Sequence, residues 1–124
     1  MNFGSLEGLT LTMIEGAHKG SERVQLTTLD GRVFRMMHHQ DCCETVSVED
    51  VVGDLEDLLN SPILRAEERS SGVTPTGDGD EQWTFYELCT IKGSVTIRWL
   101  GETNGYYGTE VSFEEATLNQ RKGH

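Results

Sequence analysis

The sequence predicts an α+β domain in which a largely antiparallel β-sheet, a hairpin plus a three-stranded meander, carries one central amphipathic helix on its apolar face. Two patterns lead to this prediction. Alternating apolar residues bounded by Gly-containing turns indicate strands in both halves of the chain, and apolar residues at a helical period lie between them. The 124 residues suit one domain. We expect a single domain over residues 1–116 and a polar C-terminal tail over residues 117–124.

The N-terminal part predicts a strand and then a hairpin. An apolar alternation within residues 6–18 indicates the first strand. Segments 23–28 and 32–38 flank Leu29-Asp30-Gly31, which fits a three-residue hairpin loop with Gly in the left-handed position. This loop sets two apolar pairs on one face: Leu26 with Phe34, and Val24 with Met36.

The middle of the chain predicts the helix. Its apolar residues recur at a 3.6-residue period, on the stripe Val48, Val51, Val52, Leu55, Leu58 and Leu59. Ser47 can cap the start, and Pro62 marks a stop. The opposite face is acidic, with Glu49, Asp50, Asp54, Glu56 and Asp57. This face is either solvated or a docking surface for a basic partner.

The C-terminal half predicts the meander. A short strand over residues 63–68 and a polar, Gly-rich loop over residues 70–80 come first. Strands follow at residues 82–91, 94–101 and 106–113. Three-residue loops between them give the pairs Phe85 with Trp99, Glu87 with Ile97, Cys89 with Val95, Ile97 with Val111, and Val95 with Phe113. Trp83, Phe85 and Trp99 then form the floor under the helix.

Composition limits the possible functions. The net charge is −11, which argues against a primary surface for DNA or RNA. No apolar run approaches the roughly 20 residues of a membrane span, and the N-terminus lacks the pattern of a signal peptide. Three cysteines are an odd number and do not make a secreted disulfide framework. We therefore expect a reducing, cytoplasmic setting.

The densest cluster of reactive side chains precedes the predicted helix: His38, His39, Asp41, Cys42, Cys43 and Glu44. One interpretation is structural, with free cysteines, Cys89 included, buried as small apolar residues and a histidine tied to a carboxylate. A second is a metal site, although a second ligand pair is missing. A third is a cysteine nucleophile whose pKa a neighbouring histidine lowers, but four such residues on one bend cannot all converge.

A second polar group lies on the other face of the meander, with Tyr86, Arg98, Asn104, Tyr106, Tyr107 and Glu110. Arg98 is one of ten basic residues and is expected opposite Glu110 across the ladder. As structure, this is an exposed ion pair. As function, a guanidinium flanked by tyrosines and an amide can clamp a phosphate and a base.

Two stretches carry a resemblance. They are HHQDCCETVSVEDVVGDLEDLLNSPILRAEE (His38–Glu68) and WTFYELCTIKGSVTIRWLGETNGYYGTEVSFEE (Trp83–Glu115). They resemble a family of small proteins of tailed bacteriophages and prophages, in which the Asp-Cys-Cys-Glu bend and the Thr-Ile-Lys-Gly to Asn-Gly-Tyr-Tyr meander recur together. The resemblance implies the cytoplasm of an infected bacterium as the setting and an action against bacterial immunity.

Three functional hypotheses follow. The leading one is a non-enzymatic counter-defence protein that sequesters a small nucleotide-type immune signal as a homo-oligomer, with no cofactor and no metal. Its ligand residues are Arg98, Asn104, Tyr106 and Tyr107, with His39, Asp41 and Glu44 as a second wall. The alternative is an acidic interaction module that masks a basic surface of a host defence or nucleic-acid-binding protein through Glu49, Asp54, Glu56 and Asp57. The third is a metal- or cysteine-dependent enzyme at the Asp-Cys-Cys-Glu bend.

Overall fold

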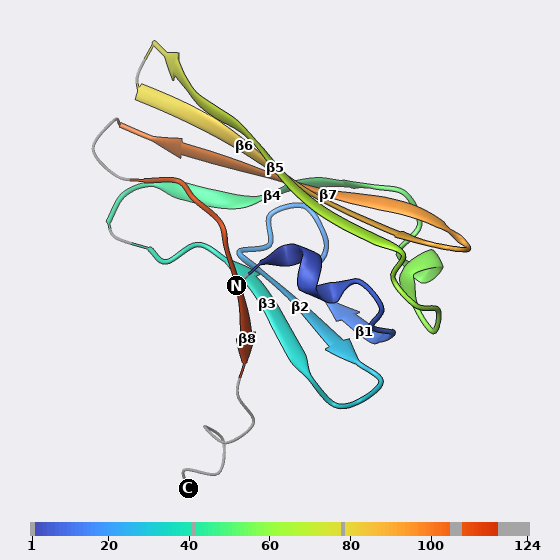
Figure 1. Ribbon diagram of the computed structural model, residues 1–124. Coiled ribbons are helices and arrows are strands. Elements are labelled where there is room, and N and C mark those ends of the chain that lie inside the picture. The colour runs from blue at the N-terminus through green and yellow to red at the C-terminus, as the bar shows by residue number, and fades with distance from the viewer. Residues whose placement is uncertain (1, 41, 78, 105–107, 117–124) are drawn as a thin grey trace, which may run out of the picture.

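A computed structural model describes residues 2–40, 42–77, 79–104 and 108–116. These residues form two antiparallel four-stranded sheets (Figure 1). The first sheet has the order β1 (Leu11–Glu15), β2 (Arg23–Thr28), β3 (Val33–Met37) and β8 (Ser112–Ala116). The second has the order β4 (Thr45–Val52), β7 (Gly93–Thr103), β6 (Gly79–Thr90) and β5 (Arg65–Thr76). Two short 3₁₀ turns, η1 (Phe3–Leu6) and η2 (Leu55–Leu58), complete the described elements.

One apolar core lies between the two sheets. The first sheet contributes Leu26, Phe34 and Met36, and the second contributes Tyr86, Ile97 and Trp99, all of which are fully buried. Burial raises the pKa of Tyr86, and its hydroxyl donates a hydrogen bond to the carbonyl oxygen of Val111 at 3.3 Å. The core is therefore formed by two facing sheets rather than by a sheet and a helix.

The α+β prediction is wrong because the predicted helix is strand β4 followed by a turn and η2. Val48 lies opposite Trp99, and Val51 lies opposite Ile97, with a bulge between them at Glu49. A bulge adds one residue to a strand, so two residues three apart can face the same side. Gly53, at φ +112°, then turns the chain against the backbone of Ser94 and Val95. These irregularities reproduce the spacing of a helical stripe.

The first strand and the hairpin are confirmed. β1 forms within the predicted segment, and β2 pairs with β3 in the predicted register: Val24 with Met36, and Leu26 with Phe34. All four of these side chains are buried. Gly31 has φ +90° and the amide of Thr28 donates to the carbonyl of Arg32, so the loop has the predicted three residues.

The predicted register between β6 and β7 is wrong by one residue. Thr90 pairs with Gly93, so the connecting turn has two residues, Ile91 and Lys92. Phe85 therefore lies opposite Arg98 instead of Trp99, and the predicted pairs of Glu87 with Ile97 and Cys89 with Val95 do not form. The shift has a physical reason, because it removes Glu87 from the apolar face and replaces it with Tyr86 and Leu88.

Two further predictions for the C-terminal half are wrong. The last strand, β8, pairs with β3 in the first sheet, so the pairs of Ile97 with Val111 and Val95 with Phe113 do not form. β4 takes the place beside β7 instead. Residues 70–80, predicted as a loop, are largely strand, since β5 and β6 form one long hairpin there. The predicted tail, residues 117–124, lies outside the described residues.

The outer edge of β4 is occupied by the loop before β2. The amide of Gly20 donates to the carbonyl of Val48, and the amide of Val48 donates to the carbonyl of Ser21, both at 2.8 Å. These bonds satisfy backbone groups that an edge strand otherwise presents to solvent. Among the described residues, no helix is long and apolar enough to cross a membrane.

A strand and a helix place the side chains of Val48 and Val52 differently. A helix would bury both, whereas the strand buries only Val48. Val48 is 1% exposed and Val52 is 54% exposed, although both lie on the predicted helical stripe. We expect Val48→Ala to lower the free energy of unfolding by about 2 kcal/mol, because it leaves a cavity in the core. Val52→Ala should change it by less than about 0.5 kcal/mol. Urea unfolding of both variants measures this, and equal losses would contradict the strand.

Candidate functional site

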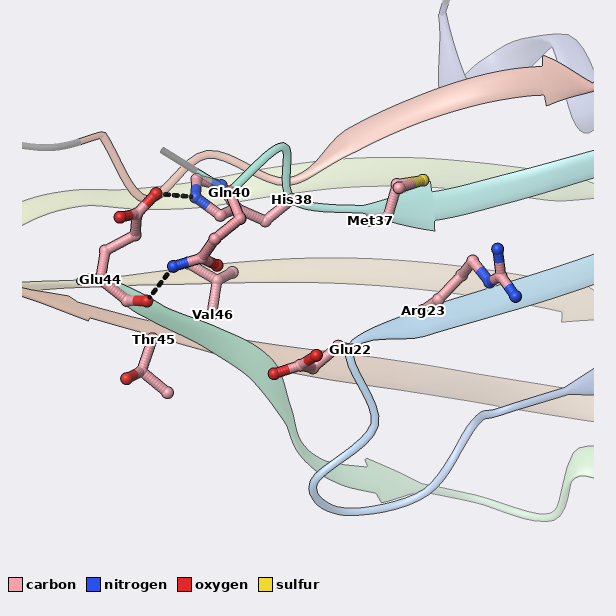
Figure 2. A pocket seen from close by; sticks show the side chains of 8 residues that line it. All are labelled: Glu22, Arg23, Met37, His38, Gln40, Glu44, Thr45 and Val46. Carbon is pink, nitrogen blue, oxygen red and sulfur yellow. Dashed lines mark hydrogen bonds and ion pairs between the residues drawn. The ribbon is translucent and has the colours of Figure 1, made fainter. Parts of the chain in front are cut away.

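The loop from His38 to Glu44 joins β3 of the first sheet to β4 of the second, and it holds a buried pair of hydrogen-bonded polar side chains (Figure 2). Nε2 of His38 lies 2.6 Å from Oε2 of Glu44, and the Glu44 side chain is fully buried. Nδ1 of His38 lies 2.7 Å from the carbonyl oxygen of Glu110. Because a carbonyl only accepts, Nδ1 carries a proton and donates it.

The backbone of the same loop completes this group. Oε1 of Glu44 accepts a hydrogen bond from the amide of Cys42 at 3.0 Å. The side-chain amide of Gln40 donates to the carbonyl of Glu44 at 2.6 Å and to that of Cys42 at 3.1 Å. A buried carboxylate needs such partners to offset its desolvation. The prediction of a histidine tied to a carboxylate is confirmed, and the pair connects both sheets with the segment before β8.

The bonding of this pair limits its chemistry. Both ring nitrogens of His38 and both oxygens of Glu44 are engaged. A general base or a metal ligand needs a nitrogen or oxygen lone pair directed at a substrate or an ion. Among the described residues, no group of three or more His, Cys, Asp and Glu side chains is arranged to hold a metal ion.

The cysteines differ from the prediction. Cys42 and Cys43 are exposed and form a disulfide with each other, so the expectation of buried free thiols is wrong for both. Cys89 is a free, half-buried thiol, and its Sγ lies 3.5 Å from Nη2 of Arg65. The pKa of Arg65 is raised, first by the negative charge that Cys89 can carry and then by Glu87 and Glu67.

Two open cavities adjoin this loop. The first, of about 470 Å³, is lined on one side by His38, Gln40 and Glu44 and on the other by Glu22 and Arg23 (Figure 2). The second, of about 520 Å³, lies where β6 begins and β7 ends. It is lined by Cys43, Thr45, Thr76, Gly77, Asp80, Glu102, Thr103 and Asn104. Both contain carboxylates, so neither favours a phosphate.

The four predicted ligand residues that the structure describes do not form one site. Arg98 lies in the middle of β7 and pairs with Asp50 at 3.1 Å, not with Glu110. Asn104 lies at the second cavity. Nε2 of His39 bonds Glu114 at 2.7 Å on the surface. Glu44 belongs to the buried pair. Asp41, Tyr106 and Tyr107 lie outside the described residues.

The predicted acidic helix face does not exist either. Glu49 is at the bulge and pairs with Lys19 at 3.3 Å. Asp54 caps η2 by accepting a hydrogen bond from the amide of Glu56 at 3.0 Å. Asp57 lies against Gly93 at the β6–β7 turn. These residues are therefore spread over a strand, a turn and a 3₁₀ segment.

Strand register instead reveals a site whose two aromatic residues, Trp83 and Phe85, the sequence prediction placed in the core. We call the side of the second sheet that faces away from the first sheet the outer face. Figure 1 shows no other described element over it. The rings of Trp83 and Phe85 stack there with centroids 6.0 Å apart and an interplanar angle of 4°. The guanidinium carbon of Arg98 lies 4.9 Å from the Trp83 ring centre and 6.0 Å from that of Phe85. These three residues are the aromatic–arginine cluster.

Carboxylates lie on both sides of this cluster. Toward the second cavity, Glu81 lies opposite Glu102 in the β6–β7 ladder. No described cation pairs with either of them, although like charges opposite one another are unfavourable. Toward the other end, Glu87 pairs with Arg65 at 3.4 Å and with Arg69 at 3.6 Å. The outer face thus has an apolar, cationic centre. Its end toward the second cavity is acidic, and at the other end the carboxylates are paired with arginines.

A model of the family described as a domain of unknown function, DUF7448, matches residues 7–113. This span contains seven of the eight strands and the start of β8. The chain belongs to this family. No curated protein and no solved structure matches the chain. The described part of this DUF7448 protein is a fold of two β-sheets, and its function has to be inferred from its own residues.

The buried pair of His38 with Glu44 and the exposed pair of His39 with Glu114 are expected to contribute differently to the free energy of unfolding. Glu44→Ala leaves His38 buried without its carboxylate, so we expect the free energy of unfolding to fall by about 3 to 5 kcal/mol. The matched control is Glu114→Ala, which removes the carboxylate of the exposed pair with His39 and should cost less than about 1 kcal/mol. Guanidinium unfolding of both variants measures the difference, and similar small losses would mean that the Glu44 pair is not structural.

Proposed function

We propose that this DUF7448 protein is a non-enzymatic interaction module that binds a basic surface of a partner protein through its outer face. The observation that carries the proposal is the uncovered aromatic–arginine cluster of Trp83, Phe85 and Arg98 between carboxylates. Trp and Arg are the residues most enriched among those that dominate binding energy at protein interfaces. A sheet face with this composition favours a macromolecular partner.

The charge of the module indicates the charge of the partner. The net charge of −11 attracts basic surfaces over long range and speeds their encounter with the protein. On the outer face, Glu81 and Glu102 supply carboxylates that no described basic residue neutralises. A lysine or arginine from the partner would relieve their mutual repulsion. This is the acidic-module hypothesis, with the binding face moved from the predicted helix to the sheet.

The setting of this function is also a proposal. The resemblance of the Asp-Cys-Cys-Glu bend and of the meander to small phage proteins supports the cytoplasm of an infected bacterium. The partner would then be a host defence protein or a nucleic-acid-binding protein with a basic surface. Masking such a surface requires shape and charge and no chemical step.

Affinity capture from a bacterial lysate, followed by quantitative binding, tests the outer face. Trp83→Ala should weaken binding of the captured basic protein about 30-fold, because it removes the centre of the cluster. Reversing both Glu81 and Glu102 to Lys should weaken binding at least about tenfold and reduce its salt dependence.

The control for this experiment reverses two exposed acids away from the outer face, Glu56→Lys with Glu110→Lys. It makes the same change in net charge and should leave affinity nearly intact. If the control weakened binding as much as the Glu81 and Glu102 reversal, net charge alone would account for binding. If Trp83→Ala bound normally, the outer face would not be the interface.

The nucleotide hypothesis is the second candidate, and one observation favours it. A guanidinium above stacked rings can hold a base by stacking and a phosphate by charge. Arg98 is already paired with Asp50, and the side chains of this pair are 36% and 45% exposed. An anion must therefore displace a carboxylate of the protein, which ranks this function below the first.

Tryptophan fluorescence separates the two candidates. The chain has two tryptophans, of which Trp99 is fully buried and Trp83 lies on the outer face. A nucleotide at the cluster should quench Trp83 saturably during titration with mono-, di- and cyclic nucleotides, and Trp83→Phe should abolish the signal. No saturable quenching at millimolar concentrations would exclude the cluster as a nucleotide site.

A further inference from the structure

The loop between the two sheets contains the only disulfide among the described residues, between the adjacent residues Cys42 and Cys43. Both residues are exposed, whereas structural disulfides of small domains usually close long loops inside the protein. A bridge between neighbours closes almost no chain, so it contributes little to stability by restricting the unfolded state. Its exposure makes both sulfurs accessible to an attacking thiolate.

We propose that Cys42 and Cys43 are a redox-active site that exchanges with dithiol reductants. A thiolate of the reductant attacks Sγ of one cysteine, the bond between the two protein sulfurs breaks, and a mixed disulfide forms. The second thiol of the reductant then attacks the mixed disulfide and releases the second cysteine sulfur. The reductant loses two electrons and two protons and becomes a disulfide, and the protein gains two thiols.

The site is coupled to the buried pair by a hydrogen bond. The amide of Cys42 donates to Oε1 of Glu44, and Oε2 of the same carboxylate bonds His38. The side chain of Gln40 also holds the carbonyl of Cys42. The amide and the carbonyl of Cys42 therefore both take part in hydrogen bonds of the loop that joins the two sheets.

The site also adjoins the outer face. Cys43 lines the second cavity together with Glu102, and Glu102 belongs to the acidic end of the outer face. Thr45, at the start of β4, lies opposite Glu102 in the ladder, two residues after Cys43. Oxidation and reduction therefore take place next to the proposed interface. The redox chemistry itself requires no partner protein and can be tested independently of the proposed function.

Alkylation under native conditions, followed by intact mass spectrometry, tests the site. After treatment with the thiol oxidant diamide and its removal, iodoacetamide should add one group, on Cys89, of the three cysteines. After reduced dithiothreitol it should add three, and re-oxidation before alkylation should return the number to one. The Cys89→Ser variant is the matched control. Iodoacetamide should add no group to it after oxidation and two groups after reduction.

Two results would overturn the proposal. Three additions after the oxidising treatment would mean that Cys42 and Cys43 stay thiols, and one addition after reduction of the folded protein would mean that the disulfide does not exchange. A single variant, Cys42→Ser, supplies an independent readout. Its unpaired Cys43 should form a mixed disulfide with oxidised glutathione, whereas the oxidised wild-type protein should not add glutathione at this position.

Discussion

The two-residue turn between β6 and β7 is the constraint on which the rest of the second sheet depends. Because side chains alternate across a strand, the length of this turn decides which half of each strand faces the core. With Thr90 opposite Gly93, Tyr86, Ile97 and Trp99 all point inward. The same register places the aromatic–arginine cluster outward. One strand register therefore determines both the core and the candidate interface. A shift of this register would exchange the residues of both faces.

Local chemistry explains which parts of the fold could be predicted. The β2–β3 hairpin follows from a loop whose Gly adopts a positive φ and from two strands that alternate without interruption. The segment around β4 does not alternate, since the bulge at Glu49 and the turn at Gly53 shift the apolar residues to a helical spacing. A single sequence contains no separate mark for a bulge. Periodicity alone therefore led to the wrong element.

The candidate sites also differ in whether neighbouring residues in the sequence are enough to predict them. The tie between His38 and Glu44 was among the predicted possibilities because the two residues lie on one short bend. The outer cluster was not predicted, since Trp83 and Phe85 are the largest apolar residues of their strand and were assigned to the core. Only the pairing with β7 shows that they lie beside Arg98. Long-range pairing, which the sequence does not display, thus determines where this chemistry lies.

The buried pair and the outer cluster have separate roles in this molecule. His38 and Glu44 hold together β3, β4 and the segment before β8, so they position the two sheets. Trp83, Phe85 and Arg98 do not contribute to the core and are available to another molecule. This separation allows the outer face to vary in sequence without loss of the fold, because a site can be carried on a stable scaffold that it does not stabilise.

The pairing of β8 with β3 joins two distant parts of the chain. Phe34 and Glu115 lie in register although most of the chain separates them. The first sheet therefore lacks β8 until residues 112–116 have been synthesised, and one edge of β3 stays unpaired until then. Contacts between distant residues also slow folding, because a long loop must close before they gain any energy. Pairing of β8 with β3 is thus the long-range contact that completes the first sheet.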